Sequence, residues 1–123
     1  MYWLFTRGSG WNRLLPKYGA NAEPPGARLT GQTIKVGAVR WRLCVTVVLA
    51  DRGLYLHPRP ALGSVLGGPR PLLVPWSDLK RPRDGHLYVG WRAVELSVGD
   101  PELASLTVPL ALYEQMRPRI FAR

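Results

Sequence analysis

Cysteine and long apolar runs are scarce in this chain. Its 123 residues include a single cysteine, Cys44, so no internal disulfide can form. Cys44 lies within the apolar run 43–50, where we expect a small buried side chain and not a nucleophile. That run is far shorter than the roughly 20 apolar residues of a membrane-spanning helix. The first residues also lack the features of a signal peptide. We therefore expect a soluble, cytoplasmic protein, with peripheral attachment to the inner face of the membrane left open.

Residue patterns that support catalysis or metal binding are also missing. His57 and His86 have no cysteine or carboxylate at metal-ligand spacing. The glycines of 63–68 are not followed by the Gly-Lys-Ser/Thr step of a phosphate-binding loop. Asp78 and Asp84 flank a basic turn, where we interpret them as a turn former and a partner of neighbouring cations. We therefore predict a protein that is not an enzyme, with no catalytic residue, no metal and no cofactor.

The charge is strongly unbalanced. Lysine and arginine number 17 against 8 aspartates and glutamates, which gives a formal net charge of +9. An excess of this size attracts polyanions, either nucleic acid or an anionic membrane. The basic residues are mostly arginines, and they are spread from Arg7 to Arg123 without forming a block. A GC-rich coding sequence also produces many arginines, alanines, glycines and prolines, so the charge alone does not establish a ligand.

The length and the apolar content of 46% indicate one domain with its own core. We divide the chain into an N-terminal segment, 1–27, and a β-rich domain, 28–123. The N-terminal segment has a short helix at about 9–18 and then a loop of prolines and glycines. Trp11, Leu14 and Tyr18 recur at helical spacing in that helix, and Pro16 limits its length.

From residue 28 the apolar residues alternate with polar ones, which predicts β-strands. We expect strands at 29–36, 39–50, 54–56, 72–76, 86–91, 93–98 and 106–108. The prolines and glycines of 57–71 predict a long loop, and 81–85 predicts a polar turn. Helical spacing after Pro109 predicts a final helix at about 109–118, which Pro118 ends or kinks.

The run LLVPWSDL, residues 72–79, predicts a corner between two strands. An apolar strand stops at a Pro-Trp step and continues into the polar residues Ser77 and Asp78. We interpret Trp76 as the side chain that anchors this corner and Asp78 as its turn former. The corner is therefore a feature of architecture and not of chemistry.

The order of these elements resembles the pleckstrin-homology-like (PH-like) barrel. The segments GLYLHP, LLVPWSDL, LYVGW, AVELSV and LTVP are similar to the bacterial PH and GRAM-type branch, in which a strand ending in an aromatic-Ser-Asp-aliphatic step recurs. The resemblance covers roughly residues 28–120. It implies a mainly β fold: a seven-stranded antiparallel, partly open barrel with a C-terminal capping helix. The short N-terminal helix is an addition to that pattern.

The resemblance also implies a first candidate site. Relatives that bind phosphoinositides carry a lysine and then two basic residues flanking one other residue in the loop between the first two strands. Lys35, Arg40 and Arg42 occupy such positions in KVGAVRWR. Three cations on one loop would bind phosphate by charge-assisted hydrogen bonds. Strand alternation offers a structural alternative, with Arg40 and Arg42 on one side and Trp41 in the core.

A second basic group, Lys80, Arg81 and Arg83, lies in the predicted polar turn. We therefore predict a non-enzymatic binding or scaffolding module that takes a protein or peptide partner or anionic lipid head groups. Nucleic-acid binding is the alternative, and it requires basic residues interleaved with exposed aromatic side chains on one sheet face. The candidates are Arg40, Trp41, Arg42, Tyr55, Tyr88, Trp91 and Arg92, with Tyr55 and Tyr88 as a possible exposed pair. A homodimer formed through an edge strand also stays open.

Overall fold

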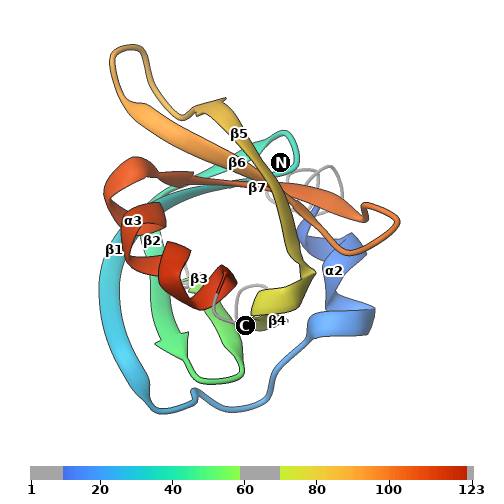
Figure 1. Cartoon of the computed structure of the whole chain (residues 1–123). Helices are drawn as coiled ribbons and strands as arrows, with labels where there is room; N and C mark the ends of the chain where they lie inside the picture. The colour runs from blue at the N-terminus through green and yellow to red at the C-terminus, as the bar shows by residue number, and fades with distance from the viewer. Residues whose placement is uncertain (1–9, 59–69, 122–123) are drawn as a thin grey trace, which may run out of the picture.

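A computed structural model describes residues 10–58 and 70–121 of the chain (Figure 1). Seven antiparallel strands form one sheet in the order β4-β3-β2-β1-β7-β6-β5. The strands are β1 (Gly26–Val36), β2 (Val39–Ala50), β3 (Gly53–Pro58), β4 (Leu72–Pro75), β5 (Leu79–His86), β6 (Arg92–Val98) and β7 (Ala104–Pro109). The helices are α2 (Trp11–Tyr18) and α3 (Leu110–Ile120), and a 3-10 turn, η1 (Trp76–Asp78), joins β4 to β5.

The sheet curls on itself into a partly open barrel, with α3 lying across one opening in Figure 1. The predicted mainly β architecture, with a C-terminal helix and a short N-terminal helix, is confirmed. The inner face of the curled sheet supplies the buried aliphatic side chains of the core, and a smaller buried cluster of Val48, Ala50 and Tyr55 lies apart from it. The fully buried core residues include Ile34, Val36, Val45, Leu54, Leu56, Leu72, Leu96 and Leu106.

The N-terminal helix α2 is part of the same core. Trp11, Leu14 and Tyr18 are buried on its inner side, one helical turn apart, as their spacing predicts. The Trp11 indole Nε1 donates a 2.8 Å hydrogen bond to the carbonyl oxygen of Arg70. Pro16 lies exposed near the end of this eight-residue helix, where it removes one backbone hydrogen bond and the helix ends two residues later.

The strand β5 lies where the sequence predicts a polar turn, and this prediction is wrong. Residues 80–84 are all exposed, so no apolar alternation marks them as a strand. They are held in place by backbone pairing with β6, from Leu79 opposite Val98 to His86 opposite Arg92. A one-residue bulge at Arg81, with φ at 56°, and the following Pro82 interrupt the pairing. Charge, proline and a bulge are what protect an edge strand from pairing with another chain.

The expected strand at 86–91 is correspondingly wrong, because residues 87–91 form the turn between β5 and β6. Leu87 is 2% exposed, but Val89 is fully exposed and Trp91 is 53% exposed, so their alternation does not define a buried face. Gly90 adopts φ of 81° at the tip of the turn. Apolar residues at period two therefore mark a protruding turn here and not a core strand.

The predicted corner at 72–79 is confirmed, with Trp76 and Asp78 both in η1. The Trp76 indole Nε1 donates to the carbonyl oxygen of Ala50 at 2.8 Å. Asp78 accepts twice: its carbonyl oxygen from the N–H of Gly99, and its carboxylate from the hydroxyl of Tyr18 at 2.7 Å. These contacts connect the corner to β2, to the β6–β7 turn and to α2.

The C-terminal helix differs from expectation in its extent. α3 continues through Pro118 to Ile120, and Leu112, Tyr113, Met116 and Ile120 form its buried stripe. Pro118 is exposed, and the helix ends two residues after it, at Ile120. In the predicted loop 57–71, His57 and Pro58 extend β3, and 59–69 lies outside the described residues.

We expect Tyr18→Phe to lower the free energy of unfolding by about 1.5–3 kcal/mol at neutral pH, the value of a hydrogen bond to a charged group. Chemical denaturation measures the change. In a background of Asp78→Ala the same substitution should cost much less, because the hydroxyl has already lost its acceptor. An equal cost in both backgrounds would show that the hydrogen bond to Asp78 contributes nothing.

The same pair should give stability a pH dependence. Burial, together with the hydrogen bond to the Asp78 carboxylate, raises the pKa of Tyr18 above its ordinary value. A pKa that is higher in the folded state gives stability that is complete below the unfolded tyrosine pKa of about 10 and is lost as the pH rises further. Denaturation between neutral pH and pH of about 11 should therefore show a steeper loss for the wild type than for Tyr18→Phe.

Candidate functional site

The β1–β2 hairpin carries the first predicted cation group on the outer face of the sheet. Lys35 and Arg40 are directly opposite each other across the two strands, so their side chains share one face. Trp41 points the other way, where it packs against the core with its ring 5.2 Å from that of Trp11. The prediction that strand alternation turns Trp41 toward the core is therefore confirmed. Lys35 and Arg40 lie on the outer face.

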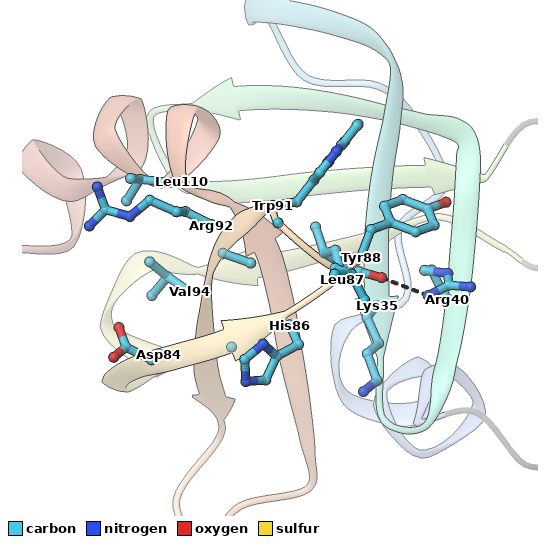
Figure 2. A pocket seen from close by; sticks show the side chains of 14 residues that line it. Lys35, Arg40, Asp84, His86, Leu87, Tyr88, Trp91, Arg92, Val94 and Leu110 are labelled. Carbon is cyan, nitrogen blue, oxygen red and sulfur yellow. Dashed lines mark hydrogen bonds between the residues drawn. The ribbon is translucent and has the colours of Figure 1, made fainter.

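The β5–β6 turn lies against this hairpin, as Figure 2 shows. The Arg40 guanidinium donates a 2.6 Å hydrogen bond to the carbonyl oxygen of Leu87 and lies 4.3 Å from the centre of the Tyr88 ring. The guanidinium of Arg42 is farther away, at 5.9 Å from the same ring. Trp91 packs edge-on against Tyr88 with the ring centres 5.1 Å apart. Arg40 therefore connects the two hairpins.

An open groove of about 900 Å³ lies where the β1–β2 hairpin, the β5–β6 turn and the start of α3 meet. Its polar lining residues are Lys35, Arg40, Asp84, His86, Tyr88 and Arg92. In Figure 2, Arg92 extends toward Leu110 of α3 while Arg40 lies on the opposite side of the turn. A second hollow of about 550 Å³ shares Lys35, Arg40 and His86 with the groove and adds Arg42.

The second predicted cation group does not join the first, because carboxylates surround it on β5. Lys80 lies 3.6 Å from the carboxylate of Asp100. Arg83 lies 3.3 Å from Glu95 and 3.5 Å from Glu102. Arg81 is exposed at the bulge. Exposed ion pairs contribute little to stability, but they cancel the local charge.

The cations of the first group, unlike Lys80 and Arg83 on β5, are not paired with described carboxylates. Within 10–58 and 70–121, no carboxylate lies within ion-pair distance of Lys35, Arg40, Arg42 or Arg92. Asp84 is the acidic residue of the groove lining, so the cations outnumber it. The cations of the groove are therefore not paired with described carboxylates, whereas Lys80 and Arg83 on β5 are.

The aromatic candidates of the nucleic-acid hypothesis lie in different environments. Tyr55 is 2% exposed and packs with Val48 and Ala50, so exposure is wrong for this residue. Trp41 packs against the core, whereas Trp91 is 53% exposed as that hypothesis requires. Sequence reasoning misses that residues 87–91 form a turn, because it places them on a strand.

The described residues offer little for catalysis. Cys44 is half-buried, and burial raises the pKa of its thiol, which disfavours the reactive thiolate. Among residues 10–58 and 70–121, no group of three or more histidines, cysteines or carboxylates is arranged to hold a metal ion. The groove can attract and orient an anion through its cations, and its lining also includes His86 and Asp84.

Comparisons with known proteins assign nothing further. No family model, curated protein or solved structure matches the chain. The PH-like resemblance therefore stays a prediction. No helix in the described ranges has the length and apolar character needed to cross a bilayer.

We expect Arg40→Ala to lower the free energy of unfolding by about 1–2 kcal/mol, because it removes a hydrogen bond and a cation–π contact. Amide hydrogen exchange at Trp91, whose N–H bonds the carbonyl oxygen of Tyr88, should accelerate as the turn loosens. Arg42→Ala is the matched control, with an expected change below about 0.5 kcal/mol. Equal effects of the two substitutions would contradict a connecting role for Arg40.

Proposed function

We propose that this protein is a non-enzymatic module that binds an anionic membrane surface through the groove between the β1–β2 hairpin and the β5–β6 turn. The observation that carries the proposal is the gathering of Lys35, Arg40, Arg42 and Arg92 with no neutralising carboxylate among the described residues. Each lysine or arginine near an anionic surface contributes about 1 kcal/mol of binding free energy. Four such residues on one side of a small protein support peripheral attachment to anionic lipids.

The resemblance to PH-like barrels supports the same proposal. A strand order of β4-β3-β2-β1-β7-β6-β5 with a C-terminal helix across one opening agrees with that architecture. The cation positions at Lys35, Arg40 and Arg42 are those that the resemblance implies for phosphate binding. Fold alone does not determine function, so the proposal depends on the cations and not on the family. The inner face of a cell membrane, with its anionic lipids, is the surface that this charge fits.

A membrane fits the exposed side chains better than nucleic acid does. Proteins that bind single strands stack bases on several exposed aromatic rings. Here Tyr55 is buried and Tyr88 is covered by Arg40 and Trp91, which leaves Trp91 as the exposed ring of the site. The most exposed apolar side chain is Val89, which has no ring on which a base can stack but can be buried among lipid chains.

Vesicle sedimentation tests the proposal. The wild type should sediment with phosphatidylcholine vesicles that contain phosphatidylglycerol and stay in solution with phosphatidylcholine alone. Binding should weaken as salt increases, because exposed charges are screened. Lys35→Glu combined with Arg42→Glu should weaken binding by roughly 30-fold or more, since two contributions of about 1 kcal/mol are lost and negative charge is added.

The matched control is Arg13→Glu combined with Arg52→Glu, which changes the net charge equally on α2 and on the β2–β3 turn. Both arginines are exposed, and neither lines the groove. This control should lose far less affinity than Lys35→Glu/Arg42→Glu. An equal loss would show that total charge and not the groove governs binding. No sedimentation with anionic vesicles, together with a mobility shift of an oligonucleotide at physiological salt, would replace the proposal with nucleic-acid binding.

A further inference from the structure

The β5–β6 turn presents two apolar side chains to water in the middle of a cationic surface. Val89 is fully exposed, and Trp91 is 53% exposed. Both belong to the turn 87–91, which Figure 1 shows extending outward from the curled sheet. Single exposed apolar residues are ordinary on a protein surface. Two of them in one protruding turn place exposed apolar surface at this end of the hairpin, and we call this pair, Val89 and Trp91, the apolar tip.

The cations lie behind the apolar tip and not at its end. His86 and Arg92 are the last paired residues of β5 and β6, so they flank the base of the turn. Val89 is three residues from each, a span of at most about 10 Å in extended chain. Lys35 and Arg40 line the groove beside the same base. A surface that meets this hairpin therefore contacts apolar atoms first and positive charge a few ångströms behind them.

This arrangement, with apolar atoms in front of positive charges, matches the interfacial region of an anionic bilayer. Tryptophan favours the layer between head groups and acyl chains, and basic side chains reach back to the phosphates. A second copy of this chain is a poor occupant, since a symmetric contact through the tip would bring the same cations together. A folded protein partner is the remaining occupant, and a probe placed at the tip distinguishes it from a bilayer.

The apolar tip is held in one conformation before it meets anything. Arg40 donates to the carbonyl oxygen of Leu87, and the N–H of Trp91 donates to the carbonyl oxygen of Tyr88. The Tyr88 ring is packed between the Arg40 guanidinium and Trp91. A pre-ordered turn loses little conformational entropy when it binds. Arg40 is thus a positioning residue for the tip as well as a cation of the groove.

We infer that the β5–β6 turn inserts Val89 and Trp91 into the interfacial layer of an anionic bilayer, while His86, Arg92 and Lys35 lie at the level of the phosphates. This inference rests on the proposed membrane binding, and it adds the depth and the orientation of the bound protein. Charge then brings the protein to the surface, and the apolar tip keeps it there. Binding should therefore retain a part that salt does not remove.

A fluorescent probe at the tip tests insertion. Val89→Cys in a Cys44→Ser background takes the environment-sensitive label NBD at one place, because Cys44 is the single natural cysteine. With vesicles of phosphatidylcholine and phosphatidylglycerol, the NBD emission should shift to the blue and become protected from iodide. Lipids labelled with a quencher near the head group should quench it more than lipids labelled near the chain end. The same label on Arg52→Cys, at the β2–β3 turn, should stay in water.

Substitutions in the natural Cys44 background provide an independent test. Val89→Asp should weaken binding to anionic vesicles at least tenfold without loss of folding, because the side chain is fully exposed. Val89→Thr, which keeps the shape and adds a hydroxyl, should weaken binding less. Trp91→Ala should also reduce the part of binding that survives high salt.

The outcomes separate the inference from the proposed function. Sedimentation with the probe at residue 89 still in water would overturn insertion and leave membrane binding intact. A blue shift at residue 52 in place of residue 89 would show that another face meets the membrane. Absence of sedimentation would overturn both, and capture of a folded partner that Val89→Asp abolishes would then assign the apolar tip to a protein contact.

Discussion

The fixed corner at η1 is the constraint on which the rest of the structure depends. A seven-stranded sheet can bury its inner face only if it curls, and the chain must change direction between β4 and β5 to do so. Trp76 and Asp78 hold that change of direction through Ala50, Gly99 and Tyr18, which belong to parts of the fold far apart in the sequence. Because β5 starts directly after this corner, the corner fixes where β5 begins to pair with β6, and the bulge between Lys80 and Arg83 then shifts the register that leads to the β5–β6 turn.

The sequence predicts elements well where one face must be buried. The alternation in β2, β6 and β7 and the helical spacing of Leu112 and Met116 follow from such burial, and the structure has those elements where expected. Prediction from the sequence fails at β5 and at the turn that follows β5, for one physical reason. An edge strand is defined by backbone pairing and needs no apolar face, so residues 80–84 resemble a polar turn. The turn 87–91 resembles a strand because its apolar side chains point out.

The candidate site could be predicted only in part, because charge compensation is a tertiary property. Lys35, Arg40 and Arg42 can be chosen from sequence as a local cluster. Nothing in the local sequence, however, shows that Asp100 and Glu102 pair with Lys80 and Arg83. It also does not show that no described carboxylate lies within ion-pair distance of Lys35, Arg40 or Arg42. The contact between Arg40 and Tyr88 likewise joins two hairpins that lie far apart along the chain. The net charge of +9 therefore does not show where the candidate site lies unless the tertiary structure is known.

In the proposed membrane binding, the two hairpins would contribute long-range and short-range forces respectively. Electrostatic attraction extends over about 8–10 Å at physiological salt and would orient the cationic side toward an anionic surface before contact. Apolar burial acts only on contact, and Val89 and Trp91 would supply it because they are exposed in a turn that extends outward from the sheet. Arg40 belongs to both parts, since its charge lies in the groove while its hydrogen bond to Leu87 fixes the turn. A purely charged surface would contact only the cations, and a purely apolar surface would contact only Val89 and Trp91. An anionic bilayer can contact both.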